Sequence, residues 1–315
     1  MPAQPPANVF AGPYVDRASG LRKDPAWVAE ALGDPATRFV PVWRTQNLVG
    51  QSAEPSALLL PRTALPAFAP DAGILLGRFR GAAAFAIELD AAALPPPGLD
   101  GDFIDLRLAG GLLPVDEAGL LAYARAMLWW RNRHRYCGTC GSPSEPADAG
   151  HVMRCTRSSC ATEFFPRIDP AIIVLVTDGE RALLGRQASW PTGRYSTIAG
   201  FVEPGESFED AVVREVREET SVEVGDIEYR SSQPWPFPSS VMVGFVARAR
   251  RTTIACPDGE LEDARWFSCA EMATGTPALP PPQSISFRLI ADWYAGRTGR
   301  ALRDEPGAAL WSAQR

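Results

Sequence analysis

The sequence lacks several features that would assign it to specialised classes of protein. It has no hydrophobic run of the roughly 18 residues that a membrane-spanning helix needs, and its longer apolar stretches, such as residues 171–176, have the length of strands. The first ten residues contain neither the basic nor the apolar segment of a secretory signal. Six cysteines in 315 residues are too few for a disulfide scaffold. We therefore expect a cytoplasmic protein with no membrane partner.

The length of the chain, 315 residues, indicates about two domains. Residues 1–20 are rich in proline, alanine and glycine and are predicted to form a flexible arm. Short apolar runs at 39–43, 57–60, 74–76 and 83–89 predict a β-rich domain over residues 21–133. This domain ends in a helix over 116–133, with Asp116 as its N-cap. We interpret it as a scaffold or dimerisation domain.

Four of the six cysteines lie within 24 residues, a concentration typical of a metal site. Cys137 and Cys140 form a CxxC pair, and Cys155 and Cys160 form a second pair with a wider spacing. Four thiolates complete the tetrahedron that zinc prefers and leave no open position, so we predict one structural zinc ion. A redox role for the CxxC pair is the weaker alternative, because it does not explain the second pair.

The two histidines, His134 and His151, flank this cluster and are candidates to replace a cysteine, although a hydrogen-bonded role is favoured for each. Around the ribbon, residues 125–167 contain seven arginines against three acidic residues, a local charge of +4. Contact with RNA phosphates is compatible with this charge, and a solvated basic face is the favoured interpretation. The net charge of the whole chain is −6, which argues against a general nucleic-acid coat.

The most informative segment lies between Gly200 and Val222. A strand over 171–176, a turn at 178–179 and a return strand over 181–185 precede it, and a helix is predicted from about Ser207 to Thr220. Within that helix three glutamates at i, i+3 and i+4 share one face. Clustered carboxylates repel one another unless cations are bound, and hard divalent ions such as Mg²⁺ or Mn²⁺ take oxygen ligands. The pattern therefore predicts a divalent-metal site built from Glu215, Glu218 and Glu219.

This segment resembles the Nudix box, Gly-x5-Glu-x7-Arg-Glu-U-x-Glu-Glu-x-Gly-U, where U is a bulky aliphatic residue. Ser221 is the single departure and stands where the pattern has glycine. A left-handed backbone is common at this position after a helix, and serine there costs about 1 kcal/mol or less. The resemblance implies that Glu215 and Glu219 bind Mg²⁺ or Mn²⁺ with help from Glu218 and the main-chain carbonyl of Ala199. It also implies catalytic roles for Glu206 and Arg214, where the arginine is a natural partner of the carboxylate.

Residues 232–240 resemble the SQPWPFPxS signature of the NADH pyrophosphatase branch of the Nudix family. The zinc ribbon upstream is a second feature of that branch, and the resemblance covers about residues 136–294. It implies substrate contacts for residues of the signature and for aromatic or nucleotide-lining positions elsewhere: Gln233, Trp235, Phe237, Ser240, Phe165, Phe201 and Ser286. Phe165 stands where the branch commonly has a stacking tyrosine. Glu260 matches a later metal-binding glutamate, with Glu262 and Asp263 as near alternatives.

The implied fold is α+β, with the N-terminal β-rich domain, a zinc ribbon over 134–166, a Nudix α/β/α sandwich with a mixed sheet over 167–300, and a tail over 301–315. The implied reaction is hydrolysis of the pyrophosphate bond of NAD(H) to AMP and (reduced) nicotinamide mononucleotide. Two or more Mg²⁺ or Mn²⁺ ions assist it. The branch also implies a homodimer and removal of NAD caps from RNA. The alternatives are a Nudix diphosphatase for another nucleotide, such as ADP-ribose, or a catalytically dead zinc-ribbon module that binds nucleic acid.

Overall fold

The computed structural model describes residues 8–257 and 259–308. They form two compact units. The first unit runs to Ile168 and includes residues 234–239, whereas the second comprises residues 169–233 and the chain from Ser240 onward. In the described residues no helix has the length and apolar character needed to cross a membrane.

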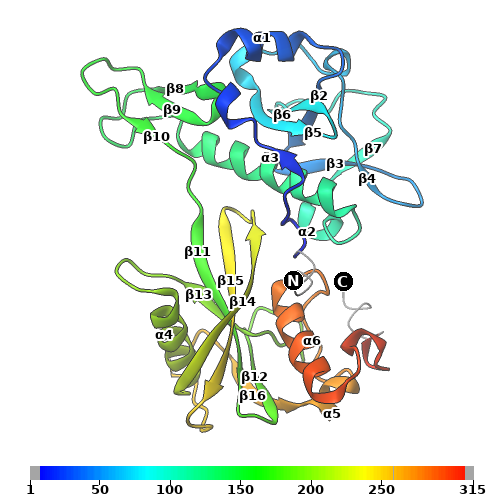
Figure 1. The fold of residues 1–315 in the computed structure, drawn as a ribbon, viewed down its shortest axis with the longest axis vertical. Helices are drawn as coiled ribbons and strands as arrows, with labels where there is room; N and C mark the ends of the chain where they lie inside the picture. The colour runs from blue at the N-terminus through cyan, green and yellow to red at the C-terminus, as the bar shows by residue number, and fades with distance from the viewer. Residues whose placement is uncertain (1–7, 258, 309–315) are drawn as a thin grey trace. The chain divides into compact units, whose positions relative to one another are not determined.

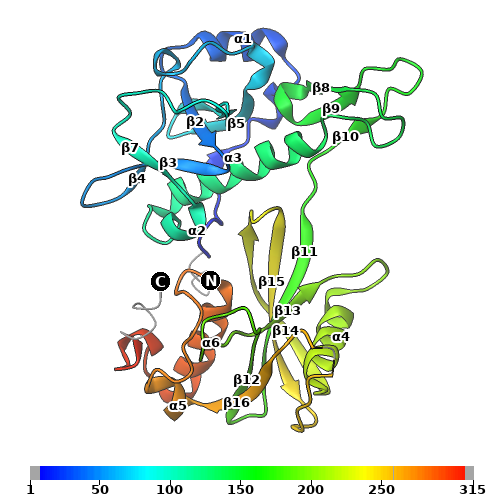
Figure 2. The same cartoon turned by 180° about the vertical axis from the view of Figure 1, so that it is seen from behind.

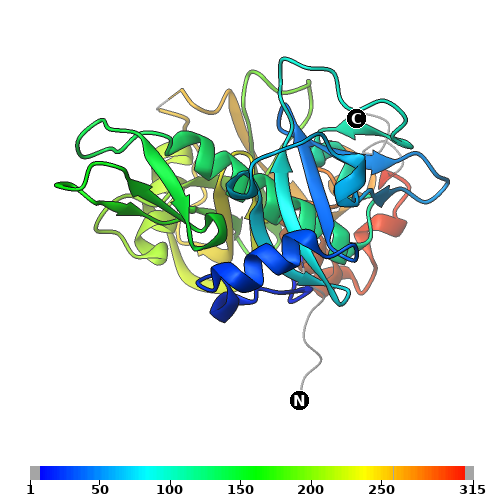
Figure 3. The ribbon, with the colours of Figure 1, turned by 90° about the horizontal axis from the view of Figure 1, so that it is seen from above.

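The first unit is built on a seven-stranded mixed sheet. Its strand order is β1 (Val15–Asp16), β5 (Ile74–Phe79), β6 (Ala82–Glu88), β2 (Arg38–Trp43), β3 (Gln46–Gly50) and β4 (Ser56–Ala57), and β7 (Gly101–Ile104) pairs with β3. Strands β2 and β6 are parallel at the centre. Helix α3 (Val115–Arg133) packs on one face of the sheet and α1 (Pro25–Gly33) on the other, as Figure 3 shows. Helix α2 (Leu106–Ala109) precedes α3.

The predicted helix over 116–133 is confirmed, but its N-cap was wrong. The helix begins at Val115 after Pro114, so Asp116 lies in the first turn, where its charge complements the helix dipole. The predicted strand over 57–60 was also partly wrong, because β4 ends at Ala57 and Leu60 makes only an isolated bridge to Phe39. Helix α1 was not predicted from the sequence.

The predicted flexible arm, residues 1–20, falls partly outside the described residues, since these begin at Asn8. From Asn8 onward the chain does not behave as an arm. Phe10 is buried in the core of the first unit, and strand β1 pairs with β5. The aromatic ring of Phe10 lies 5.9 Å from that of Phe237, a residue of the same unit. Burial of this ring explains why the segment is held on the sheet.

The ribbon that follows α3 is a three-stranded antiparallel sheet, with β9 (Val152–Cys155) between β8 (Ser144–Ala147) and β10 (Glu163–Phe164). Cys155 ends β9, and the other three clustered cysteines lie before β8 or between β9 and β10. The 3₁₀ helices of the described chain lie at Ser19–Leu21, Arg62–Ala64, Pro70–Ala72, Asp148–Gly150 and Leu302–Asp304.

The second unit is a three-layer sandwich around a six-stranded mixed sheet (Figures 1 and 2). The strand order is β14 (Val224–Trp235), β15 (Ser240–Ala249), β11 (Asp169–Thr177), β12 (Arg181–Arg186) and β16 (Asp263–Ser268), and β13 (Ile198–Phe201) pairs with β11. Strands β11 and β15 are parallel, whereas β12 and β13 run antiparallel to β11. Helix α4 (Phe208–Thr220) packs on one face, and α5 (Cys269–Ala273) and α6 (Ile285–Thr298) on the other. The expected sandwich with a mixed sheet is confirmed.

The C-terminal tail predicted over 301–315 packs on this unit for as far as it is described. Leu302 is fully buried in the α6 layer. Glu305 is also buried and accepts a hydrogen bond from the hydroxyl of Tyr294 at 2.7 Å. Residues 309–315 lie outside the described chain.

Candidate active site and zinc site

Helix α4, which contains the three predicted metal-binding glutamates, has well-defined ends. Ser207 caps its N-terminus in a capping box with Asp210, and each side chain bonds the other residue's main-chain amide. The helix ends at Ser221, which adopts the left-handed conformation with φ 59°. The predicted helix and the predicted backbone at Ser221 are both confirmed. These ends hold the glutamates in one register.

Glu215 and Glu219 are turned inward, whereas Glu218 is exposed. The side chain of Glu215 is 12% exposed and Glu219 as a whole residue 5%, against 54% for the side chain of Glu218. The carboxyl group of Glu215 lies directly over Gly200 of β13, where an added Cβ would come within 2.0 Å of it. A side chain at this position would displace the carboxylate. The glycine that opens the Nudix box is therefore required by this close approach.

Arg214 connects the helix to the loop before it. Its Nε and Nη2 donate to the two carboxylate oxygens of Glu206 at 2.5 and 2.8 Å, a bidentate pair. Its Nη1 donates to Glu215 at 2.8 Å and to Glu218 at 3.0 Å, and its Nη2 also donates to the main-chain oxygen of Phe201 at 2.9 Å. The predicted pairing of Glu206 with Arg214 is observed. One guanidinium group thus fixes the loop and two of the helix carboxylates.

The electrostatics of this network differ between the two sides of the arginine. Hydrogen bonds from Arg214 and from the amide of Glu203 lower the pKa of Glu206 to about 2, so its carboxylate is ionised at neutral pH. Burial raises the pKa of Glu215, against the opposing effect of Arg214, and the charges of Glu218 and Glu260 raise it further. The influence of Glu260 places that carboxylate near the helix glutamates. The site therefore concentrates acidic groups beside a single arginine.

The four cysteines converge as predicted. In the part of the chain that the structure describes, they are the one group of three or more potential ligands whose donor atoms all lie within 4.8 Å of one another. The Sγ atoms of Cys137 and Cys160 are 3.8 Å apart, and those of Cys140 and Cys155 are 3.5 Å apart. Thiolates at about 2.3 Å from a tetrahedral zinc ion lie about 3.8 Å from each other. The cluster therefore has the dimensions of a closed, structural zinc site.

The glutamates of α4 do not gather as tightly. Arg214 holds two of them, Glu215 and Glu218, through hydrogen bonds. Among the cysteines, hydrogen bonds from Ser142 lower the pKa of Cys140 to about 6, whereas burial raises that of Cys155. A bound zinc ion would hold both as thiolates, because the thiolate is the form that coordinates metal.

Neither histidine replaces a cysteine in the cluster. Nε2 of His151 lies 2.7 Å from the main-chain oxygen of Leu75, and Nδ1 of His134 lies 2.7 Å from that of Trp130. The hydrogen-bonded roles favoured by the sequence are those observed.

The residues of the SQPWPFPxS signature are divided between the two units. Gln233 is fully buried in the second unit, where its Nε2 donates to the main-chain oxygen of Gln283 and its Oε1 accepts from the amide of Ile285. These bonds hold the N-terminus of α6. Ser240, at the start of β15, is 9% exposed. Direct contact of either side chain with substrate stays a prediction.

The aromatic residues of the signature lie in the first unit. The rings of Trp235 and Phe237 stand edge to face at 5.0 Å, and both pack against Phe10. Arg125, on α3, lies over the ring of Phe237 and donates from Nε to the main-chain oxygen of Pro236 at 2.8 Å. Sequence reasoning did not identify Arg125 as an anchor of the signature, because an arginine on a helix offers no sign that it is buried. The predicted substrate contacts of the two rings remain untested.

The other predicted substrate residues have different surroundings. Ser286 is buried and shares hydrogen bonds with the hydroxyls of Ser196 and Thr197, so it fastens α6 to the chain before β13. Phe165 in the first unit and Phe201 in the second are exposed, at 58% and 60%. Large aromatic rings exposed to this extent are available for stacking on a planar ligand. Ala199 lies in β13, one residue before the glycine under Glu215.

Comparison with known proteins agrees with this architecture. Residues 167–289 match the NUDIX domain, residues 132–165 the NADH pyrophosphatase zinc ribbon domain, and residues 36–130 the NADH pyrophosphatase-like rudimentary NUDIX domain. The last match was not foreseen from the sequence. It accords with the parallel pair β2–β6 of the first unit, since the second unit also contains a parallel pair, β11–β15.

Several curated relatives cover most of the chain. The NAD-capped RNA hydrolase NudC of Stutzerimonas stutzeri is 42% identical over 232 residues, which cover 74% of this chain and 81% of that protein. NudC of Pseudomonas fluorescens Pf-5 is 41% identical over 235 residues, with 74% and 81% covered. The human NAD-capped RNA hydrolase NUDT12 is 41% identical over 196 residues, which cover 58% of this chain and 42% of that protein.

A helix with clustered glutamates over a sheet glycine, joined to a four-cysteine ribbon, defines a Nudix hydrolase with a structural zinc site. The chain belongs to the Nudix family, in its NADH pyrophosphatase branch.

Proposed function

We propose that the protein hydrolyses the pyrophosphate bond of NAD(H), giving AMP and (reduced) nicotinamide mononucleotide, and that it removes NAD caps from RNA. The observation that carries this proposal is the arrangement of Glu215 over Gly200, with Arg214 joining it to Glu206. Two relatives that cover most of the chain are named NAD-capped RNA hydrolases, which supports the choice of substrate.

The donor set suits divalent metal ions. Glu215, Glu218 and Glu219 offer carboxylate oxygens from one helix, and Glu260 is near enough for its charge to act on Glu215. With the main-chain oxygen of Ala199, these residues would hold two or more Mg²⁺ or Mn²⁺ ions, which prefer oxygen ligands. Such ions, when bound, neutralise the pyrophosphate and make a bound water more acidic.

The remaining residues position the substrate and the ligands. Arg214 keeps Glu206 ionised and holds the loop from Phe201 to Glu206 against the helix. The exposed rings of Phe165 and Phe201 are candidates to stack on the nicotinamide or adenine. We place the protein in the cytoplasm as a homodimer. The zinc cluster supports the compartment, because its four thiols must stay reduced.

Product analysis tests this function. Purified protein is incubated with NADH and Mg²⁺ or Mn²⁺, in parallel with Glu219→Gln and with Glu209→Gln as a matched control on the exposed first turn of α4. We expect AMP and reduced nicotinamide mononucleotide from the wild type and from Glu209→Gln. Loss of one catalytic electrostatic group typically costs about a hundredfold or more, and we expect at least this for Glu219→Gln.

The other outcomes are equally informative. Turnover of ADP-ribose without turnover of NADH would retain the Nudix chemistry and overturn the substrate. Binding of RNA with no turnover of any nucleotide would favour a catalytically dead nucleic-acid-binding module.

A further inference from the structure

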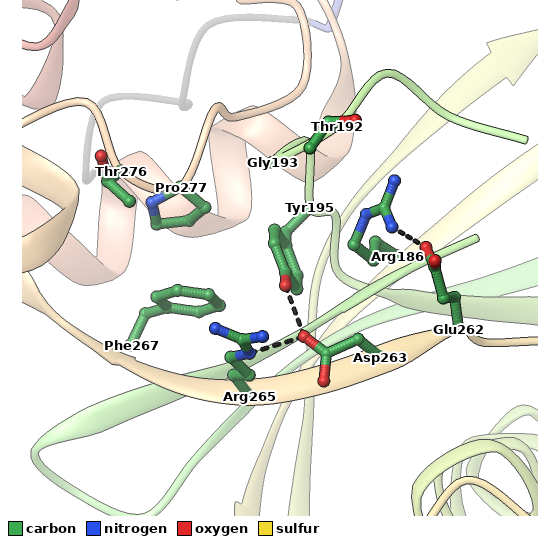
Figure 4. A pocket seen from close by; sticks show the side chains of 10 residues that line it. All are labelled: Arg186, Thr192, Gly193, Tyr195, Glu262, Asp263, Arg265, Phe267, Thr276 and Pro277. Carbon is green, nitrogen blue, oxygen red and sulfur yellow. Dashed lines mark hydrogen bonds and ion pairs between the residues drawn. The ribbon is translucent and has the colours of Figure 1, made fainter. Parts of the chain in front are cut away.

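The second unit contains a cavity whose lining includes none of the Nudix-box glutamates, although it includes Glu262 and Asp263, the alternatives to Glu260 as a metal ligand. It lies at the end of β12 and the start of β16 and has a volume of about 510 Å³ (Figure 4). This volume falls within the roughly 300–1,000 Å³ of small-molecule sites in proteins. The cavity is formed by residues of one compact unit only.

One wall of the cavity is aromatic. The rings of Tyr195 and Phe267 are each 6% exposed and stand edge to face, with centroids 5.0 Å apart. Pro277 lies beside them on the same wall (Figure 4). Only the edges of these two rings reach the surface, and with Pro277 they give this wall a rigid apolar border that suits a planar ligand.

The rim next to this wall is polar but carries no net charge, because it pairs two arginines with two carboxylates. Arg186 forms an ion pair with Glu262, and Arg265 donates from Nε to Asp263 at 2.6 Å. The hydroxyl of Tyr195 donates to the same Oδ2 atom of Asp263. An anionic or cationic ligand would meet a group of its own sign here, whereas a neutral ligand would not.

The rim also offers hydrogen-bonding groups that are not saturated. Nε of Arg186 is buried and has no hydrogen-bond partner among the residues that the structure describes. A buried donor of this kind costs free energy until an acceptor reaches it. Both contacts of Asp263 fall on Oδ2, and Oδ1 points away from them (Figure 4). The rim therefore combines this donor of Arg186 with a second carboxylate oxygen of Asp263.

The cavity lies close to the proposed catalytic residues. Only two residues separate Glu260 from Asp263, so their Cα atoms are at most about 11 Å apart. The main-chain amide of Glu262 is itself bonded to the oxygen of Arg186 at 2.9 Å, which holds the rim against the end of β12. A ribose and a phosphate bridge a distance of this order.

We propose that this cavity is a subsite for a nucleobase of the substrate, stacked on the aromatic wall and hydrogen-bonded to the rim of Arg186 and Asp263. Nucleobases are neutral, planar and carry both donors and acceptors on their edges. The base comes either from the adenosine of NAD itself or from the RNA nucleotide that follows an NAD cap. This inference rests on the proposed function.

The test fills the cavity and leaves the glutamates untouched. Thr192 lines the mouth and is exposed, so Thr192→Trp blocks entry, and Thr253→Trp is the matched control at an exposed position outside the lining. Asp263→Asn removes the acceptor charge at constant size and tests the proposal if Thr192→Trp fails to fold. KM and kcat are measured with NADH and with NAD-capped RNA. Saturation-transfer NMR with adenosine measures binding independently of turnover.

A stacked base contributes enough binding energy that its loss should raise KM at least about fivefold. We expect this rise for Thr192→Trp and Asp263→Asn, with the kcat of Thr192→Trp within twofold of the wild type, no change for Thr253→Trp, and loss of the adenosine signal. A rise with both substrates identifies the adenine of NAD, and a rise with capped RNA alone identifies the following nucleotide.

Unchanged KM for both substrates in both variants, or an adenosine signal that Thr192→Trp leaves intact, overturns the proposal. If the wild type hydrolyses neither substrate, the proposed function fails and the adenosine measurement alone decides the subsite.

Discussion

Acidification should destabilise the first unit through a single buried histidine. His151 is 8% exposed, and its Nε2 lies 2.7 Å from the main-chain oxygen of Leu75. A carbonyl oxygen only accepts, so Nε2 carries the proton of the neutral ring. Burial, and after it the nearby charges of Arg22 and Arg17, lowers the pKa of His151 to about 4. The hydrogen bond to Leu75 and the charge of Asp148 raise this pKa but are outweighed.

The sign and size of the effect follow from proton linkage. The unfolded chain takes up a proton near pH 6.5 and the folded one only near pH 4, so the unfolded state binds more protons between these values. The contribution of neutral His151 to the free energy of unfolding is therefore complete above pH 6.5 and is lost as the pH falls through 4. A shift of this size corresponds to about 3 kcal/mol in total, of which about 2 kcal/mol is lost by pH 5.

The assay compares urea unfolding of the wild type and of His151→Gln, by tryptophan fluorescence and circular dichroism, at pH 7 and pH 5. Glutamine can still donate to Leu75 but does not titrate. Any acid-induced loss of zinc affects both proteins and cancels in the comparison. The wild type should lose about 2 kcal/mol more than His151→Gln between the two pH values. Equal losses in the two proteins would refute the reasoning.

Three further predictions concern the site and the ribbon. Ser221→Gly should raise the melting temperature, measured by calorimetry, by about 1–4 °C, because glycine relieves roughly 0.5–1 kcal/mol of left-handed strain; a melting temperature below that of the wild type contradicts this. Arg214→Ala and Glu206→Gln should each lower kcat, and the double variant should be no worse than Arg214→Ala, since the two side chains act as one pair; multiplicative losses would show independent roles. Elemental analysis should find one zinc ion per chain, and Cys140→Ser should remove it and lower the melting temperature; full zinc in this variant would exclude the four-cysteine site.

Features that depend on local spacing could be read from the sequence. Helical periodicity alone puts Glu215, Glu218 and Glu219 on one face, and the seven residues between Glu206 and Arg214 leave enough chain for the pair to meet. The cysteine cluster could be predicted without knowledge of the fold, because the short spacing within each pair brings two thiols close together. The left-handed backbone at Ser221 followed from its place after the helix.

Features that depend on contacts between distant segments could not be predicted from the sequence. The contact of Glu215 with Gly200 requires β13 to pair with β11, and the approach of Glu260 requires the chain before β16 to return to the helix. Neither is a property of neighbouring residues. Helix α1 was missed because its short span gives little periodic signal before it packs on the sheet.

What the sequence determined by itself is the chemistry: which carboxylates share a helix face, which thiols can bind one metal ion, and which family pattern they follow. Only the tertiary structure decided which of the predicted residues are buried in framework contacts. Gln233 and Ser286 are occupied in hydrogen bonds that hold α6, and the ring of Phe237 packs on Phe10 and Arg125. The physical reason is that spacing along the chain sets which groups are available. Burial and pairing between remote segments set what each group touches.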